Sequence, residues 1–285
     1  MSSNNIGLHV RFKENFLDIV QQAQTYNINT VQFFLTPAIK HNMRYVSITE
    51  KIKEKFLHFK KEFSPNVYIH TSYWINPATG DSLNFQRTIQ NLEREIKLAK
   101  LLDIRSLVLH PGSATHYDPT DDDPLCKKQG IKTISKILSH ILQNTDNIEI
   151  LLENTAHANH SIGSDLEDFI LLKKELSHLK NVNFCLDIGH AFAYGYNISN
   201  IDQFVDTLDK TMGLDRIKLI HLNDTDEFCG SKKDSHVLPG TGQIGIKNLQ
   251  KYCEHEFFKT KPKILELPSE SAQTIQLILN KFTNK

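Results

Sequence analysis

Six residues of the types that bind metal ions stand at the ends of apolar, strand-like runs. They follow one another at steps of 40, 43, 34, 34 and 45 residues, in the order His70, His110, Glu153, Asp187, His221 and Glu266. A β-strand with its crossover helix needs about 30 residues or more, so each step accommodates one βα unit. In a (β/α)8 barrel the carboxyl ends of all strands meet at one mouth, where active sites lie. The spacing therefore predicts a site that holds several metal ions.

Three further candidate ligands follow the later members of this series. His190 comes just after the sixth strand, and Asp234 and His236 lie two residues apart in the long loop after the seventh. A carboxylate and an imidazole at that spacing can coordinate one metal ion from the same side. With His190 they form a His2Asp set that leaves coordination positions open, as catalytic zinc requires. Imidazole and carboxylate ligands without thiolate suit Zn, Mn or Fe.

A single polar residue at a strand end is commonly no more than a hydrogen-bonded group. Buried strand ends rarely carry unpaired charge, however, because desolvation of a charge is costly. The six residues at aligned strand ends and the three that follow them closely are therefore interpreted as metal ligands. His9, at the end of the first strand, is expected to support or pack against them, and His157 and His160 are expected to be solvated. For Trp74 a packing role and a contact with a nucleobase or sugar both remain open.

The elements that must position these residues alternate regularly along the chain. Continuous apolar runs, typical of strands buried on both faces, occupy 6–10, 30–35, 66–71, 106–110, 148–153, 182–187, 217–222 and 263–267. Amphipathic stretches lie between and after them, at 14–26, 50–62, 84–102, 128–143, 164–178, 201–212, 246–257 and 269–282. This alternation predicts one α/β domain over residues 1–285, a TIM barrel with its active site at the carboxyl ends of the strands.

Composition excludes several classes of protein. The formal net charge is zero, so no global basic field indicates a nucleic-acid partner, although a local patch is enough for binding. No apolar run reaches 18 residues and the N-terminus lacks an apolar leader, so we expect neither a membrane span nor a signal peptide. The four cysteines show no paired spacing, which suits a reducing compartment. We therefore expect a cytoplasmic protein.

Three segments of the sequence resemble the signature motifs of the endonuclease IV family, which are zinc-dependent abasic-site DNA endonucleases built on a TIM barrel. The segments are Glu153-Asn-Thr-Ala156, Asp187-Ile-Gly-His190-Ala-Phe-Ala-Tyr-Gly195-Tyr196, and His221-Leu-Asn-Asp224 with Gly230-Ser-Lys-Lys-Asp234-Ser-His236. His110-Pro-Gly-Ser113 and His70-Thr-Ser-Tyr73 are similar to the remaining metal loops of the family. The resemblance spans about residues 6 to 282, and every ligand position of the family holds the expected residue type.

The resemblance implies three Zn²⁺ ions per chain, with Mn²⁺ or Fe²⁺ as alternatives for part of the site. It assigns His70, His110 and Glu153 to one ion. It assigns Glu153 as a bridge, with Asp187, His221 and Glu266, to a second ion, and His190, Asp234 and His236 to the third. Two ions bridged by Glu153, the candidate catalytic residue, can lower the pKa of a shared water for attack on phosphorus. The third can stabilise the departing 3′ oxygen.

The implied reaction is cleavage of duplex DNA on the 5′ side of an abasic site, together with removal of groups that block 3′ ends. The loop after the second strand departs from the family pattern, so Lys40 or His41 would have to take the place of its groove-binding residues. Asp226 and Ser235 stand where the family has a lysine and an arginine, and His157-Ala-Asn-His160 replaces a glycine-rich stretch. Lys232 and Lys233 either compensate as DNA contacts or are solvated, and Tyr73 is a further candidate for contact with the DNA.

Two other functions compete with this interpretation. Sugar isomerases and epimerases share the barrel superfamily but use one or two ions, and they would have no use for the group of His190, Asp234 and His236. A non-enzymatic metal-binding or scaffold role does not explain why a costly cluster of charged groups is maintained. A count of bound metal separates these alternatives. The expected partner is duplex DNA that contains abasic sites, and the chain is expected to act as a monomer.

Overall fold

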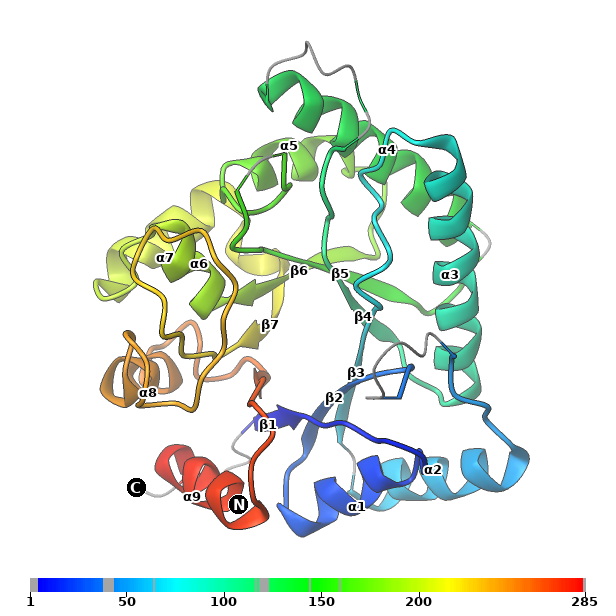
Figure 1. Ribbon diagram of the computed structural model, residues 1–285, viewed down its shortest axis with the longest axis vertical. Helices are drawn as coiled ribbons and strands as arrows, with labels where there is room; N and C mark the ends of the chain where they lie inside the picture. Colours follow the sequence, from blue (N-terminus) through cyan, green and yellow to red (C-terminus); the bar gives the residue numbers. More distant parts are fainter. Residues whose placement is uncertain are drawn as a thin grey trace.

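The computed structural model describes residues 5–37, 44–63, 65–115, 117, 123–143, 145–158 and 160–283. Eight parallel strands form a closed barrel in chain order, which confirms the expected architecture (Figure 1). The strands are β1 (Ile6–His9), β2 (Thr30–Phe34), β3 (Asn66–His70), β4 (Ser106–Leu109), β5 (Glu149–Glu153), β6 (Val182–Asp187), β7 (Ile217–His221) and β8 (Lys263–Leu265). Each lies within two residues of the range predicted from the sequence. The barrel closes because β1 pairs with both β2 and β8.

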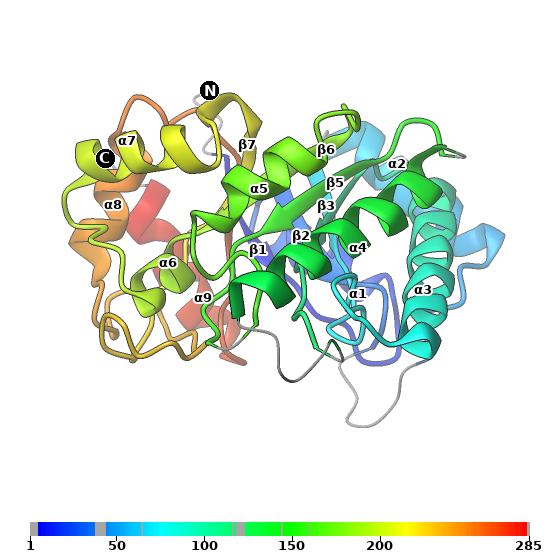
Figure 2. The ribbon, with the colours of Figure 1, turned by 90° about the horizontal axis from the view of Figure 1, so that it is seen from above.

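Helices cover the outside of the barrel (Figure 2). They are α1 (Asp18–Thr25), α2 (Glu50–Phe63), α3 (Ser82–Leu101), α4 (Asp123–Gln143), α5 (Asp168–Glu175), α7 (Ile201–Thr211), α8 (Ile246–Glu254) and α9 (Ala272–Thr283). All eight were predicted, although α1, α5, α8 and α9 are shorter than expected and α4 begins five residues earlier. Within the described residues no helix is long and apolar enough to span a membrane.

A short helix, α6 (Ile188–Tyr194), was not predicted. It begins directly at the end of β6, where the Asp187 side chain accepts the His190 backbone N–H at 2.7 Å and so caps the helix. At seven residues α6 is too short for the amphipathic pattern that reveals longer helices. Its consequence for the site is that His190 lies on a helix whose start is fixed by another candidate ligand.

One layer of buried apolar side chains fills the barrel directly beneath the mouth. It consists of Tyr68, Val108, Leu151, Cys185, Leu219 and Ile264. Each of these residues stands two positions before one of the six candidate ligands of the strand series. Because side chains in a strand alternate between its two faces, residues two apart share a face. All six ligand side chains are thereby directed into the barrel, above a floor that excludes water.

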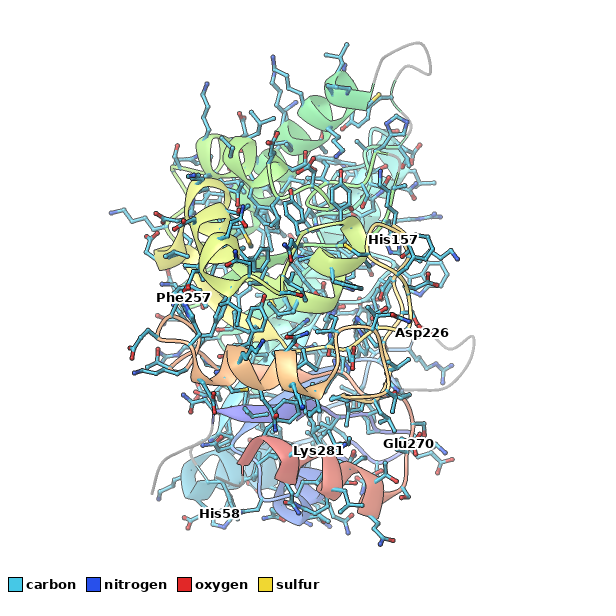
Figure 3. The ribbon with its side chains drawn as sticks, turned by 90° about the vertical axis from the view of Figure 1, so that its left-hand side faces the viewer. His58, His157, Asp226, Phe257, Glu270 and Lys281 are labelled. Carbon is cyan, nitrogen blue, oxygen red and sulfur yellow. The ribbon has the colours of Figure 1, made fainter. Side chains whose placement is uncertain are left out.

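The mouth is formed by the loops that follow the carboxyl ends of the strands. Figure 3 shows His157, after β5, together with Asp226, after β7, and Glu270, after β8, on the same side of the molecule. Phe257, which precedes β8, lies on the opposite side. The candidate ligands and the loops that can reach a substrate therefore share one end of the barrel.

Candidate metal centre

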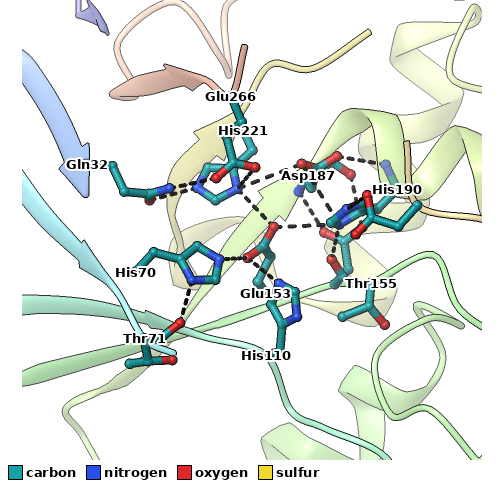
Figure 4. A network of polar contacts seen from close by, with 12 residues as sticks. Gln32, His70, Thr71, His110, Glu153, Thr155, Asp187, His190, His221 and Glu266 are labelled. Atoms are coloured by element: carbon teal, nitrogen blue, oxygen red, sulfur yellow. Dashed lines mark hydrogen bonds and ion pairs between the residues drawn. The ribbon is translucent and has the colours of Figure 1, made fainter. Parts of the chain in front are cut away.

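Glu153 lies at the centre of the cluster and is fully buried (Figure 4). Its Oε2 atom lies 3.2 Å from Nε2 of His70 and 3.2 Å from Nε2 of His110. Its Oε1 atom lies 2.9 Å from Nδ1 of His221. The two oxygens of one carboxylate thus face two different groups of imidazoles. This is the arrangement that a carboxylate bridging two metal ions requires.

The second group surrounds His221, whose backbone is in register with Asp187 across β6 and β7. Nδ1 of His221 lies 3.7 Å from the Asp187 carboxylate and 3.5 Å from the Glu266 carboxylate. Asn223 joins these two acids, because its Nδ2 donates to Asp187 at 2.6 Å and to Glu266 at 3.1 Å. Glu153, Asp187, His221 and Glu266 offer ligand atoms that all lie within 4.8 Å of one another.

The third group joins α6 to the loop after β7. Oδ1 of Asp234 lies 3.1 Å from Nε2 of His190 and 3.4 Å from Nε2 of His236. The structure adds a neighbour that the sequence did not assign to this group, since ligand atoms of Asp187, His190 and His236 also lie within 4.8 Å of one another. Asp187 therefore stands between the second and third groups.

Hydrogen bonds to neighbouring groups select which nitrogen of His70 and of His190 faces the cluster. Nδ1 of His70 bonds the Thr71 carbonyl at 2.8 Å and leaves Nε2 toward Glu153. Nδ1 of His190 bonds the Asn154 carbonyl at 2.8 Å, and its buried Nε2 makes no hydrogen bond within the described residues although Asp234 is close. A ligating histidine commonly donates its other N–H to such a carbonyl, which fixes the tautomer.

Gln32, on β2, orients His221 and was not identified from the sequence. Its Oε1 lies 2.9 Å from Nε2 of His221, so that Nδ1 is left free for the cluster. Its Nε2 donates to Glu266 at 2.8 Å and contacts Nδ1 of His9 at 2.9 Å. Burial lowers the pKa of His9 to about 4, so the neutral ring accepts this hydrogen bond near pH 7. The whole donor capacity of the Gln32 amide nitrogen is thus used within the site.

The buried charges of the cluster shift one another's protonation. Burial opposes charge on the His221 ring, but Cys185 and the Glu266 carboxylate outweigh it and hold the pKa of His221 well above its usual value. Burial likewise opposes charge on His190, and Asp187 and Asp234 raise its pKa well above the usual value. For Glu153 burial would raise the pKa, but His221 and His110 lower it well below the ordinary range.

Asp224 holds the loop that carries Asp234 and His236. Its carboxylate accepts backbone N–H groups from five residues at 2.8–3.3 Å, namely Thr225, Gly240, Gly242, Ile244 and Gly245. A Cβ at Gly242 would lie 2.4 Å from this carboxylate, so the turn needs glycine there. In the same loop the Ser235 hydroxyl donates to the Asp226 carboxylate at 2.5 Å.

The candidate DNA contacts fall into different surroundings. Tyr73 as a residue is 65% exposed, and its ring centroid lies 5.5 Å from those of both His70 and His110. Trp74 is 72% exposed, so the packing role left open by the sequence is excluded. The Lys233 ammonium lies 3.6 Å from Glu227, whereas that of Lys232 lies over the Tyr194 ring. Lys40 and His41 lie outside the described residues.

The cluster suits metal ions by chemistry and by spacing. Two ligand atoms placed about 2.0–2.1 Å from one tetrahedral zinc lie roughly 3.3 Å apart. The separations of 2.9–3.4 Å between ligand atoms around Glu153 and Asp234 are close to that value. The donors are nitrogen and oxygen, and none of the four cysteines, all of them free thiols, belongs to the three groups. These residues can therefore hold ions of the zinc, manganese or iron type.

Comparison with known proteins agrees with this geometry. The model of the xylose isomerase-like TIM barrel family matches residues 20–280. The chain is 31% identical over 276 residues to a probable endonuclease 4 of Halothermothrix orenii, covering 94% of this chain and 95% of the relative. Endonuclease IV from Thermus thermophilus has a similar fold, with a TM-score of 0.79 at 22% identity, over 98% of this chain and 97% of that one.

A D-tagatose 3-epimerase-like protein shares the barrel as well, with a TM-score of 0.65 at 18% identity over 92% of this chain and 91% of that one, which shows similarity of fold alone. Because the family model and the sequence of a relative both extend over nearly the whole chain, this protein belongs to the endonuclease IV family of the xylose isomerase-like TIM barrels and is a metal-dependent nuclease.

Proposed function

We propose that the protein hydrolyses the phosphodiester on the 5′ side of abasic sites in duplex DNA and removes groups that block 3′ ends. The observation that carries this proposal is Glu153, whose two carboxylate oxygens face separate groups of imidazoles at the mouth of the barrel. The further proposal is that the nine candidate ligands hold three Zn²⁺ ions, with Mn²⁺ or Fe²⁺ as alternatives in part. All nine belong to one chain, so we expect a monomer to be sufficient.

Each group of residues in the site has a separate role in the proposed hydrolysis. Bound ions would lower the pKa of a water molecule and neutralise the charge of the phosphate. Glu153 holds the first two groups of ligands at a fixed separation on either side of its carboxylate. The apolar floor beneath the cluster excludes bulk water, which strengthens every charge interaction above it. The group of His190, Asp234 and His236 lies to one side, where we place the departing 3′ oxygen.

Aromatic residues at the mouth provide a surface for the damaged nucleotide. Tyr73 stands beside His70 and His110, and its exposed ring can contact the sugar that lacks a base. Trp74 is also exposed and can stack against a neighbouring base. Lys40, which lies outside the described residues, remains a candidate groove contact. Tyr73→Ala should weaken binding to abasic duplex more than it slows single-turnover cleavage.

The experiment that tests the proposal uses a duplex with one stable abasic-site analogue and a 5′-labelled damaged strand. The zinc-loaded protein should cut once, immediately 5′ to the analogue, and a DNA polymerase should extend the new end because it carries a 3′-hydroxyl. The same duplex with an intact base is the control. A cut on the 3′ side, or equal cleavage of the intact duplex, would contradict the proposal. Epimerisation of a ketohexose without DNA cleavage would favour the sugar-epimerase alternative.

Glu153→Ala removes the shared carboxylate and should abolish turnover, because it eliminates several kcal/mol of transition-state stabilisation, on the order of 10³-fold or more in rate. The measurement is single-turnover cleavage at saturating protein. More than about a tenth of the wild-type rate in a correctly folded variant would show that the two groups do not share this carboxylate.

A further inference from the structure

A second polar cavity lies beside the metal centre, and none of the nine candidate ligands belongs to it. It has a volume of about 290 Å³ and is lined by Lys127, His157, Ala158, His160, Ser161, Tyr194 and Lys232. Among the described residues no carboxylate belongs to this lining, although the chain as a whole has equal numbers of acidic and basic residues. The volume is just below the range for small-molecule sites, about 300–1,000 Å³, and suits one ionic group. Of the two lysines in this lining Lys127 is already paired with Asp168, so Lys232 is the positive charge that the cavity offers to an anion, beside the polar groups of His157 and Ser161.

Contacts among the lining residues and with their neighbours fix the walls of this lysine–histidine cavity. Lys232 adopts a left-handed backbone conformation with φ of 59°, and its N–H donates to the Ala193 carbonyl at 2.8 Å. Its ammonium then lies 5.3 Å from the centroid of the Tyr194 ring. Tyr194 in turn donates to Asp165 at 3.3 Å. The cation is thus held by the backbone and by an aromatic face.

The opposite wall is joined to the loop that begins at His110. The His160 carbonyl accepts the Ala114 N–H at 2.8 Å, and Ser161 forms a β-bridge with Ser113. Lys127 reaches the cavity from α4 while its ammonium bonds Asp168, outside the lining, at 2.9 Å. The described part of this wall is therefore held in place by the protein itself, which reduces the entropy lost on binding.

The position of the cavity relates it to the third group of ligands. His157 is close enough to Asp234, His190 and His110 for their charges to act on its ring. Lys232 is two residues from Asp234 along the chain. A DNA strand whose scissile phosphate lies over Glu153 would bring its next phosphate to one side of the cluster. The cavity offers cationic groups on the side of His190 and Asp234.

We propose that the lysine–histidine cavity binds the backbone phosphate one nucleotide to the 5′ side of the scissile phosphate. This inference rests on the proposed function, which places the departing 3′ oxygen beside the third group. Lys232 supplies the charge, Tyr194 keeps that charge in place, and His157 and Ser161 supply hydrogen bonds to phosphate oxygens.

The test measures binding of the nicked product duplex, which keeps the neighbouring phosphate and cannot be cut again. Binding of three nicked duplexes is compared by fluorescence anisotropy. The first keeps all its phosphates. The second has a neutral methylphosphonate one nucleotide 5′ of the nick, and the third has the methylphosphonate one nucleotide 3′ of the nick. The 5′ replacement should weaken binding to the zinc-loaded wild-type protein about tenfold, and the 3′ replacement should have less effect. Lys232→Met keeps the aliphatic stem over Tyr194 and removes only the charge.

Lys232→Met should weaken binding of the all-phosphate duplex about tenfold and should then be insensitive to the 5′ methylphosphonate, because the two changes remove the same contact. Lys233→Met is the matched control, and its effect should be equal on all three duplexes. Lys232→Arg should restore the sensitivity, which separates loss of charge from loss of fold. The proposal is overturned if the 5′ methylphosphonate weakens binding equally in wild type and in Lys232→Met. It is also overturned if Lys232→Met removes the effect of the 3′ methylphosphonate instead.

Failure of the proposed function is recognised separately. If the wild-type protein does not cut the abasic duplex, that function is wrong whatever the binding data show. If it cuts correctly and Lys232→Met shows no coupling, only the cavity is misassigned. His157→Ala provides a second variant on the other wall, and it should reduce the sensitivity to the 5′ methylphosphonate in the same direction as Lys232→Met.

Discussion

At the scale of single residues, the site depends on groups that are not themselves candidate metal ligands. Gln32 is fully buried and bonds His221, Glu266 and His9 at once. Its carbonyl oxygen can only accept, so it selects the tautomer of His221 that presents Nδ1 to the cluster. Asn223 acts in a comparable way, since one amide contacts both Asp187 and Glu266. Such partners determine how well a ligand set is organised before an ion arrives.

Replacing Gln32 by leucine keeps much of the volume but removes both hydrogen bonds to ligands. His221 and Glu266 should then lose their fixed orientations, and affinity for metal at the second group should fall by about 10- to 100-fold. Competition of the loaded protein with a chelator of known affinity measures this change. In the Gln32→Leu protein, the ion of the second group should be the first that the chelator removes. Unchanged metal retention in a folded Gln32→Leu protein would show that the amide does not orient these ligands.

At the scale of elements, helices and loops hold the strand-end residues in place through buried acids. Glu95, on α3, is 1% exposed and accepts the Ser72 N–H at 3.1 Å and the Tyr45 hydroxyl at 3.1 Å. It thereby ties α3 to the loop that follows His70. Burial raises the pKa of Glu95 to about 7, although both of these hydrogen bonds act to lower it.

This raised pKa predicts a specific dependence of stability on pH. The folded protein holds a proton on Glu95 up to about pH 7, whereas the unfolded chain releases it near its ordinary pKa of 4.5. Stability should therefore fall as pH rises from 4.5 to 7, by about 3 kcal/mol from this group once pH exceeds both values. Glu95→Gln should lack this loss and be more stable than wild type at pH 8. Urea unfolding of both proteins at pH 5.5 and 8 measures the difference, and parallel pH profiles would refute it.

The loop after β7 offers a second prediction at this scale. Asp224 accepts five backbone N–H groups, and Asp224→Ala would leave them without their partner. The loop should become disordered and release Asp234 and His236, while the groups around Glu153 remain. Elemental analysis of the purified variant should show about one ion fewer per chain than wild type, because only one of the three proposed ions depends on this loop. Loss of all the metal, or of none of it, would contradict the prediction that this loop holds only the third ion.

At the scale of the whole molecule, closing the barrel concentrates charge above an apolar layer. Glu153, Asp187 and His221 are fully buried, and the shifts of their pKa values in both directions show that the charges are balanced against one another. In the metal-free protein this balance is supplied by protons on imidazoles. Metal ions would take over that role, so binding of metal and release of protons are coupled.

The sign of this coupling follows from His190 and His221. Their pKa values lie well above the usual value, so both rings carry protons near pH 7 in the metal-free protein. A metal ion needs the neutral ring, and its affinity should therefore rise with pH, by about tenfold per pH unit for each proton released. Calorimetry of zinc binding in buffers with different ionisation enthalpies counts these protons. Zero proton release at pH 7 would show that the rings are neutral before the ion binds.

The sequence by itself determined the period of the fold and the chemistry of its mouth. Apolar runs at intervals of one βα unit predicted the correct strands within two residues, because strands buried on both faces need continuous apolar sequence. The sequence also showed that six residues of metal-ligand type stand at the ends of those runs. Their common direction into the barrel follows from the two-residue period, since each stands two positions after a member of the buried layer.

The resemblance had grouped the nine candidate ligands, but only the tertiary structure decided which other residues contact them and how the groups adjoin. Gln32 bonds Glu266, 234 residues away, because the barrel closes between its first and last strands, and no local pattern encodes such a contact. The position of Asp187 between two groups depends on the capped helix α6, which is too short to leave a periodic signal. Lys232 and Lys233 are adjacent in sequence, yet one lies over Tyr194 and the other beside Glu227. Local composition sets the types of group available, and long-range packing sets the distances between them on which the chemistry depends.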